Sequence, residues 1–170
     1  MIESARGSLE ASGASIAALA RGLTTEERNF RPKASAWSAH DVVCHLLDEE
    51  RDDFRLRLRL VLDDPGAEWP PIDPEGWPRS RDYAARDFDD TLSAWERERA
   101  ASLAWLASLE SGAVPLDNAH TMPWGPLRAG DLLTSWVAHD LLHLRQLTAR
   151  KFQYLANASA PYTTLYAGDW

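Results

Sequence analysis

The most strongly periodic stretch of this 170-residue chain runs from about residue 129 to residue 153. Its apolar side chains recur at intervals of three and four residues, which is the spacing of one face of an α-helix. The stretch therefore predicts a long amphipathic helix whose apolar face other elements must cover. The residues of this face are Leu132, Leu133, Trp136, Val137, Asp140, Leu141, Leu144, Leu147 and Thr148.

The same stretch carries two histidines, His139 and His143, four residues apart. That spacing places both imidazoles on one side of the helix, about one turn apart. Such a pair can hold a metal ion, but it also arises by chance in helices. A third ligand elsewhere in the chain would favour the metal.

Similar apolar spacing predicts three further helices, over residues 2–23, 38–62 and 82–110. Ser38 is the expected N-cap of the second of these helices. The carboxylate of Asp41, three residues later, would meet the positive end of the helix dipole.

Capping residues also mark the third helix and the first connector. Ser80 or Asp82 can cap the helix that begins near residue 82. In the connector 24–37, Thr24 and Glu27 form a Thr-x-x-Glu capping box, which predicts a turn or a single-turn helix.

The remaining segments are expected to be irregular. Five prolines and two tryptophans in residues 63–81 favour a stiff loop that packs its rings on the bundle, with a mobile lid as the alternative. Residues 112–128 are rich in proline and glycine, and no run of period two predicts a β-strand. The aromatic tail, residues 154–170, is expected to dock on the body of the protein.

Together these elements predict an all-α fold, one four-helix bundle domain over residues 1–170 with long connectors. The formal net charge of −8 disfavours nucleic acid, because no basic stripe offsets the acidic total. One cysteine, Cys44, excludes an internal disulfide and suits a reducing compartment. Residues 1–23 lack a secretory pattern, and no stretch is apolar enough to cross a bilayer. We therefore expect a soluble, cytoplasmic protein.

A bundle changes the interpretation of the histidine pair, because side chains on facing helices meet in its core. His45, on the predicted helix 38–62, is the candidate third ligand. Three neutral imidazoles bind Zn, Ni or Fe well, and they leave coordination positions open for water or substrate. The sequence does not choose among these metals.

Two motifs resemble the DinB-like superfamily: Trp37-Ser38 followed by His45-Leu46, and the run from His139 to Leu147. These DinB/YfiT-like four-helix bundles include bacterial thiol S-transferases and mycothiol-dependent maleylpyruvate isomerase. The resemblance spans roughly residues 2–150 in helix order and loop placement. It implies that His45, His139 and His143 form a three-histidine site for a divalent metal ion. The 63–81 loop and the terminal Ala-Gly-Asp-Trp have no counterpart in the pattern.

Four residues close to these histidines can act in more than one way. Asp48 and Glu49 either orient a ligand or bound water, or are solvated helix charge. Asp140 falls on the predicted apolar side, where a carboxylate needs a partner such as a histidine N–H or an arginine. Cys44 points about 100° away from His45 around the helix, so we expect a small buried residue.

Three more residues are assigned by their surroundings. His120, in the connector 112–128, is expected to face solvent rather than act near the metal as an acid or base. Arg145 and Gln146 match the superfamily pattern, and we expect both to serve helix packing.

We expect a metal-dependent enzyme that activates a thiol or water, as in thiol S-transferases, because a bound divalent ion lowers the pKa of either ligand. The expected partner is a small-molecule substrate, with a low-molecular-weight thiol as the candidate, rather than nucleic acid or a membrane. The alternatives are a non-catalytic stress-response bundle that binds a metal or a small ligand, and a bundle without metal. The aromatic 63–81 loop and the habit of the superfamily predict a homodimer.

Overall fold

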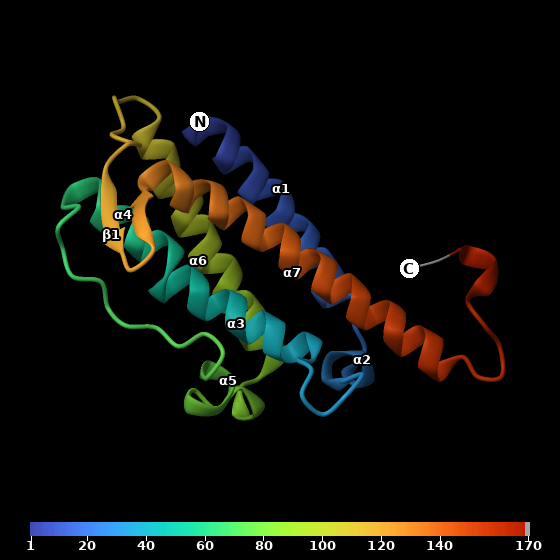
Figure 1. Cartoon of the computed structure of the whole chain (residues 1–170). Coiled ribbons are helices and arrows are strands. Elements are labelled where there is room, and N and C mark those ends of the chain that lie inside the picture. The colour runs from blue at the N-terminus through green and yellow to red at the C-terminus, as the bar shows by residue number, and fades with distance from the viewer. Residues whose placement is uncertain (169–170) are drawn as a thin grey trace.

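The body of the protein is a bundle of long helices (Figure 1), in a computed structural model that describes residues 1–168. Helix α1 packs beside α6 and α7, while α3 packs on α6 and α4 on α7. This arrangement confirms the predicted four-helix bundle, with α3 and α4 together forming one of its sides. The main elements are α1 (Ile2–Arg21), α3 (Ala39–Asp52), α4 (Phe54–Asp63), α6 (Phe88–Leu109) and α7 (Ala129–Ala158); the short ones are α2 (Thr25–Asn29), α5 (Trp77–Ser80), η1 (Tyr83–Ala85), β1 (Ala119–Met122), β2 (Gly125–Arg128) and η2 (Leu165–Ala167).

The predicted Thr24–Glu27 capping box and the predicted Ser38 N-cap are present, and Ser38 also forms a capping box with Asp41. The Ser38 hydroxyl accepts a hydrogen bond from the Asp41 backbone N–H at 3.2 Å, and the Asp41 carboxylate accepts one from the Ser38 N–H at 2.7 Å. Thr24 and Glu27 form the same reciprocal pair at the start of α2. These contacts join residues three apart, so the sequence alone specifies them.

The predicted helix 38–62 is divided at Asp53, where the backbone leaves the helical region with φ −124° and ψ −93°. The hydrogen bonds on either side persist, from Asp53 N to Glu49 O at 3.1 Å and from Arg57 N to Asp53 O at 2.8 Å. Because the helical bonding pattern continues, the apolar spacing crosses the break almost unchanged. The sequence pattern therefore hides the division between α3 and α4.

The prediction of one helix over residues 82–110, capped by Ser80 or Asp82, is wrong at its start. Helix α6 begins at Phe88, and the Asp87 carboxylate caps it by accepting a hydrogen bond from the Asp90 N–H at 2.8 Å. Asp82 adopts a left-handed conformation with φ 46°, which a helix of L-residues cannot continue. The chain before α6 instead forms the short elements α5 and η1.

Part of the connector 112–128 is a β-hairpin, which corrects the expectation that the chain has no strand. Strands β1 and β2 pair antiparallel, with Ala119 opposite Arg128 and Met122 opposite Gly125. Gly125 has φ +126°, a conformation that favours glycine at the turn. Each strand has only four residues, too few for an alternating pattern to be recognised.

Helix α7 extends to Ala158, beyond its predicted end near residue 153, and carries the following segment away from the bundle (Figure 1). The expected docking of the C-terminal tail is therefore wrong for residues 159–168, since Tyr162, Leu165 and Tyr166 are 80%, 81% and 106% exposed. The last two residues of the Ala-Gly-Asp-Trp terminus lie outside the described residues. Although α7 is long, no helix within residues 1–168 has the length and apolar character to cross a bilayer.

The tryptophans of the 63–81 segment pack on the bundle, which confirms the first interpretation of this loop. Trp77 is buried with Cys44 and Tyr83. Trp69 packs against the apolar core at the end of the bundle near β1, where the ring of His120 stacks on it at 4.2 Å between centroids.

The two larger apolar clusters of the interior are separated by buried polar residues. One cluster lies toward the C-terminal end of α1 and includes Ile16, Val43, Leu92 and Trp95, whereas the other lies toward its N-terminal end and includes Leu9, Leu58, Leu106 and Leu133. Between them along the helices lie buried polar residues that we call the polar layer: Ser12, Glu50, Arg99 and Asp140. The three histidines of interest lie on α3 and α7, close to this layer in the sequence.

Candidate metal centre

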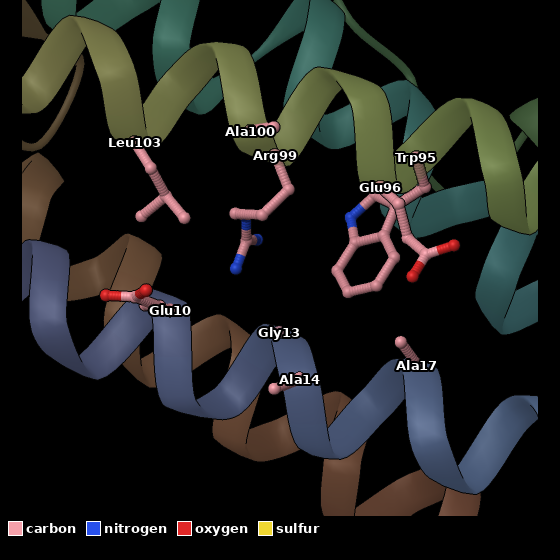
Figure 2. A pocket seen from close by; sticks show the side chains of 9 residues that line it. All are labelled: Glu10, Gly13, Ala14, Ala17, Trp95, Glu96, Arg99, Ala100 and Leu103. Atoms are coloured by element: carbon pink, nitrogen blue, oxygen red, sulfur yellow. The ribbon is translucent and has the colours of Figure 1, made fainter.

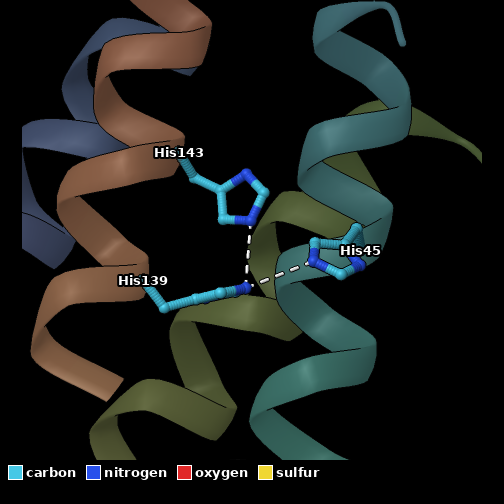
Figure 3. A group of neighbouring side chains, drawn as sticks. All are labelled: His45, His139 and His143. Atoms are coloured by element: carbon cyan, nitrogen blue, oxygen red, sulfur yellow. Dashed lines mark hydrogen bonds between the residues drawn. The ribbon is translucent and has the colours of Figure 1, made fainter. Parts of the chain in front are cut away.

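The imidazoles of His45, His139 and His143 converge between α3 and α7 (Figure 3). The Nε2 atom of His139 lies 3.3 Å from Nε2 of His45 and 3.0 Å from Nε2 of His143. Each residue offers a ring nitrogen within 4.8 Å of the others, and no other such group of three occurs within residues 1–168. The structure thus brings together all three residues that the sequence singled out.

Hydrogen bonding directs the lone pair of His143 toward the other two rings. Its Nδ1–H donates to the side-chain oxygen of Gln146 at 2.9 Å, which leaves Nε2 as the unprotonated nitrogen. Metal-binding histidines commonly hold their second nitrogen in this way. The outer nitrogen of His45, Nδ1, is buried without a hydrogen-bond partner among the described side chains.

All three imidazoles are neutral at pH 7. Burial, reinforced by the neighbouring His143, lowers the pKa of His45 to about 3. Burial likewise lowers the pKa of His139 to about 2, with His143, His45 and Arg99 acting in the same direction. Burial also lowers the pKa of His143. Neutral imidazoles with converging Nε2 atoms are the donor set that a divalent transition metal requires, so the residues present fit such an ion.

Aromatic rings form the walls of the histidine group. Trp37 meets His45 edge-on at 4.8 Å between centroids, and Phe54 lies 4.9 Å from the His139 ring. Trp77, from the 63–81 segment, lies 6.1 Å from His45. These walls exclude water from one side of the group and strengthen electrostatic interactions inside it.

Asp48 and Glu49 are both buried, so the interpretation of these residues as solvated helix charge is wrong. Glu49 Oε1 lies 3.8 Å from Nε2 of His45. Burial and the adjacent Asp53 raise the pKa of Glu49 to about 9, so its carboxyl group is protonated at pH 7 in the metal-free protein. Asp48 faces the other way and pairs with Arg81 and Arg86.

A cavity of about 580 Å³ gives access to the histidine group. A second cavity of about 730 Å³ lies between the 31–37 and 73–80 segments. Both share Ser35, Trp37 and Glu75, so the two spaces adjoin. Volumes of this size accommodate small molecules rather than macromolecules. The first cavity is lined by Ser35, Trp37, His45, Pro74, Glu75, His143 and Gln146.

The structure also shows the contacts of three residues for which the sequence left more than one role open. Asp140 forms an ion pair with Arg99, and an arginine was one of the two kinds of partner expected for it. Cys44 is fully buried, and burial raises the pKa of its thiol to about 12, which confirms a packing role. His120, on β1, lies outside the histidine group as expected, but it is half-buried against Trp69 rather than facing solvent. Its Nδ1 lies 3.2 Å from the Pro65 carbonyl oxygen.

Sequence reasoning missed two contacts near the site. Gln146, expected to serve helix packing, binds His143; its position three residues further along the same helix face could have indicated this contact. Arg99 lies in an Arg-Glu alternation that predicts a solvated face, yet it is buried with Glu50 and Asp140. The helical spacing could have indicated this, because Arg99 lies four residues after Trp95 and four before Leu103, whereas the exposed Arg97 lies off that apolar face.

Comparison with known proteins agrees with the geometry. Residues 8–147 match the family model of the DinB superfamily. The chain belongs to the DinB superfamily. A DinB-like fold is also seen in YfiT from Bacillus subtilis, described as a probable metal-dependent hydrolase with an unusual four-helix bundle topology. The two are 18% identical with a TM-score of 0.77, over 90% of this chain and 87% of YfiT, a likeness that establishes the fold. A search of curated proteins returns no match to this DinB-superfamily chain.

Proposed function

We propose that His45, His139 and His143 bind one divalent metal ion and that the protein is a metal-dependent enzyme acting on a small molecule. The observation that carries this proposal is the convergence of three neutral Nε2 atoms beside an accessible cavity. Three protein ligands leave at least one coordination position for an exogenous group. The bound ion would supply Lewis-acid chemistry, lowering the pKa of a thiol or water so that a nucleophile exists at neutral pH.

The residues of the chain divide the remaining tasks. Gln146 fixes the orientation of His143, and Trp37 lines both the histidine group and the route to it. The Glu49 carboxyl group, 3.8 Å from His45 Nε2, can exchange a proton with a group bound beside the histidines. Cys44 is not the nucleophile, because its thiol is buried and protonated. An exogenous thiol or water is therefore the nucleophile we propose.

A low-molecular-weight thiol is the first candidate for that nucleophile, and hydrolysis by water is the second. The description of YfiT as a probable metal-dependent hydrolase supports a search for hydrolysis as well as thiol transfer. The homodimer and the cytoplasmic location stay predictions of the sequence.

Elemental analysis of untagged protein tests the metal site first. We expect about one divalent metal per chain in the wild type and little in a His45→Ala variant. His120→Ala, which removes a histidine outside the group, should retain the metal. Equal metal content in wild type and His45→Ala would contradict the site.

Activity is tested with metal-loaded protein, a thiol such as cysteine and a chloroaromatic electrophile, alongside ester hydrolysis in the absence of thiol. We expect one of the two reactions to be lost in His139→Ala and kept in His120→Ala. Metal binding without turnover in either assay would instead favour the non-catalytic bundle.

A further inference from the structure

Arg99 on α6 links all sides of the bundle through a single guanidinium group. Its Nε donates to Glu50 Oε1 at 3.0 Å and its Nη2 to Glu50 Oε2 at 2.8 Å, which connects α6 to α3. Its Nη2 also donates to Asp140 Oδ1 at 2.9 Å, and Nη1 donates to Asp140 Oδ2, which connects α6 to α7. The remaining N–H of Nη1 donates to the Leu9 carbonyl of α1 at 3.0 Å.

Helix α1 approaches this group closely. Figure 2 shows the Arg99 side chain directed from α6 toward α1, where Gly13 faces it. A Cβ atom on Gly13 would already lie 3.4 Å from Nη1 of Arg99. On the same helix, Ser12 donates its hydroxyl hydrogen to Asp140 Oδ2 at 2.6 Å. The polar layer is thus fully bonded, since every guanidinium N–H has an acceptor.

The polar layer lies immediately beside the histidine group. Asp140 follows His139 on α7, and Glu50 lies five residues after His45 on α3. The two partners of Arg99 therefore belong to the same two helices that supply the imidazoles. Side chains also connect the two regions: Trp136 Nε1 donates to Glu50 Oε2 at 3.4 Å, and Phe54 contacts the rings of both Trp136 and His139.

The residues of this layer tolerate little displacement, because their charges are buried. A bidentate guanidinium–carboxylate contact holds only in a narrow range of positions, and a buried charge that loses its partner is strongly unfavourable. Sliding α7 against α3 by one residue would separate Asp140 and Glu50 from the fixed fork of Arg99. Apolar contacts such as those of the two clusters are much less directional.

We propose that Arg99 is a positioning residue of the metal site: it fixes α7 relative to α3, so that His139 and His143 meet His45. This inference rests on the proposed function, because the readout is metal affinity. It assigns Arg99 a role in setting the geometry of the ligands, in addition to any contribution to stability.

The test compares Co²⁺ binding by the full-length protein and three variants, followed by visible absorption. Arg99→Lys keeps the charge but loses the planar fork. Ser12→Ala removes the hydroxyl contacts to Asp140 and, within α1, to the Leu9 carbonyl, and it is mild enough to fold. Leu106→Ala is the matched control, since it creates a cavity in the same helix, in the apolar cluster away from the polar layer. Circular dichroism establishes that each variant is folded.

We expect Arg99→Lys to weaken Co²⁺ binding about tenfold or more and to change the absorption bands of the bound ion. Ser12→Ala should weaken binding two- to threefold, and Leu106→Ala should lower the melting temperature while leaving affinity and spectrum unchanged. Folded Arg99→Lys with the affinity and spectrum of the wild type would overturn the positioning role. If Arg99→Lys does not fold, an unchanged affinity of Ser12→Ala overturns it, as does an equal loss of affinity in Leu106→Ala.

Failure of the underlying function is distinguishable from failure of this inference. Wild-type protein that binds no Co²⁺ would overturn the proposed metal site and with it the role of Arg99. Wild-type binding that none of the polar-layer variants alters would overturn the role of Arg99 alone.

Discussion

The histidine group and the polar layer are adjacent buried polar regions, but they differ in whether their polar atoms have hydrogen-bond partners. In the polar layer each guanidinium N–H has a carboxylate or carbonyl acceptor, so the layer has no capacity left for a ligand. In the histidine group three Nε2 atoms crowd together at 3.0 and 3.3 Å, and at most a shared proton can bridge neighbouring lone pairs. Burial alone therefore does not identify a binding site. Buried lone pairs that have no partner, such as those of the Nε2 atoms, do.

The difference in charge is equally informative. Burial keeps the imidazoles neutral, whereas the polar layer pairs a cation with two carboxylates. A neutral group can be buried beside a cavity and still accept a cation, whereas an ion pair must be formed completely to be tolerated in the core.

Acid should destabilise the metal-free protein through its histidines. The folded pKa values of about 3 for His45 and about 2 for His139 lie below the unfolded value near 6.5. The stability gained by keeping these rings neutral is therefore complete above about pH 6.5 and is lost as the pH falls toward the folded values. At pH 5 the loss from these two histidines alone should reach a few kcal/mol, since each pKa unit corresponds to about 1.4 kcal/mol per group. Urea unfolding between pH 7 and pH 5 measures it.

Glu49 acts in the opposite direction over this pH range, because its folded pKa of about 9 lies above the unfolded value. Its contribution is fully present below the unfolded pKa and is lost as the pH rises toward 9, so it offsets about one histidine. A His45→Asn variant should show a shallower dependence, and His120→Ala should resemble the wild type. A dependence unchanged in His45→Asn would mean that the group is not neutral in the fold.

Removing the cation of the polar layer should cost about 3–5 kcal/mol of unfolding free energy. Arg99→Met leaves Glu50 and Asp140 buried without a counter-charge, which is the main source of the loss. Leu106→Ala, in the same helix, should lower the free energy of unfolding by a similar amount, about 2–5 kcal/mol, because it leaves a cavity in the core. Urea unfolding at pH 7 measures both, and a third variant, Glu50→Gln/Arg99→Met/Asp140→Asn, should recover part of the loss. Absence of that recovery would argue against charge as the cause.

Removing one imidazole should weaken metal binding by about two orders of magnitude while leaving the fold intact. His139→Ala is the strongest case, because Nε2 of His139 lies closest to both other rings. Competition titration against a Zn²⁺ chelator measures the affinity, and His40→Ala serves as a control on α3, outside the histidine group. If His139→Ala binds as tightly as the wild type, the histidines do not form the site.

Removing the hydrogen-bond partner of His143 should weaken metal binding about tenfold. This is the lower end of the loss of metal affinity, about 10- to 100-fold, seen when a residue that orients a metal-binding histidine is removed. Gln146→Ala frees Nδ1 of His143 and allows the ring to rotate or change tautomer. Gln153→Ala is the matched control on the same helix, since Gln153 contacts Arg150 instead. The same competition titration applies, and equal affinities for the two variants would assign Gln146 a packing role.

Features that depend on neighbouring residues were predictable from the sequence. The apolar spacing specified the long helices, because a period of 3.6 residues is a local property, and both capping boxes join residues three apart. The pair His139 and His143 shares a helix face for the same reason. The predicted bundle then offered His45 on a facing helix as the third member, and the superfamily resemblance implied the same role.

Features that depend on what lies across the fold were not predictable. Leu141, placed on the apolar face of its helix by its spacing, is 57% exposed in the fold. The run Asp48-Glu49-Glu50 appears uniformly charged in sequence, yet each carboxyl group is buried against different partners: two arginines, a histidine with Asp53, and Arg99.

The sequence by itself thus determined the long helical segments, the start of α3 at its Ser38 cap and the helix faces that the histidines occupy. Only the tertiary structure decided which partners the buried charged residues have, where α3 gives way to α4, and that the described part of the C-terminal segment leaves the bundle. The physical reason is that helical periodicity fixes the direction of a side chain from its own axis, whereas its partner is fixed by the packing of distant segments.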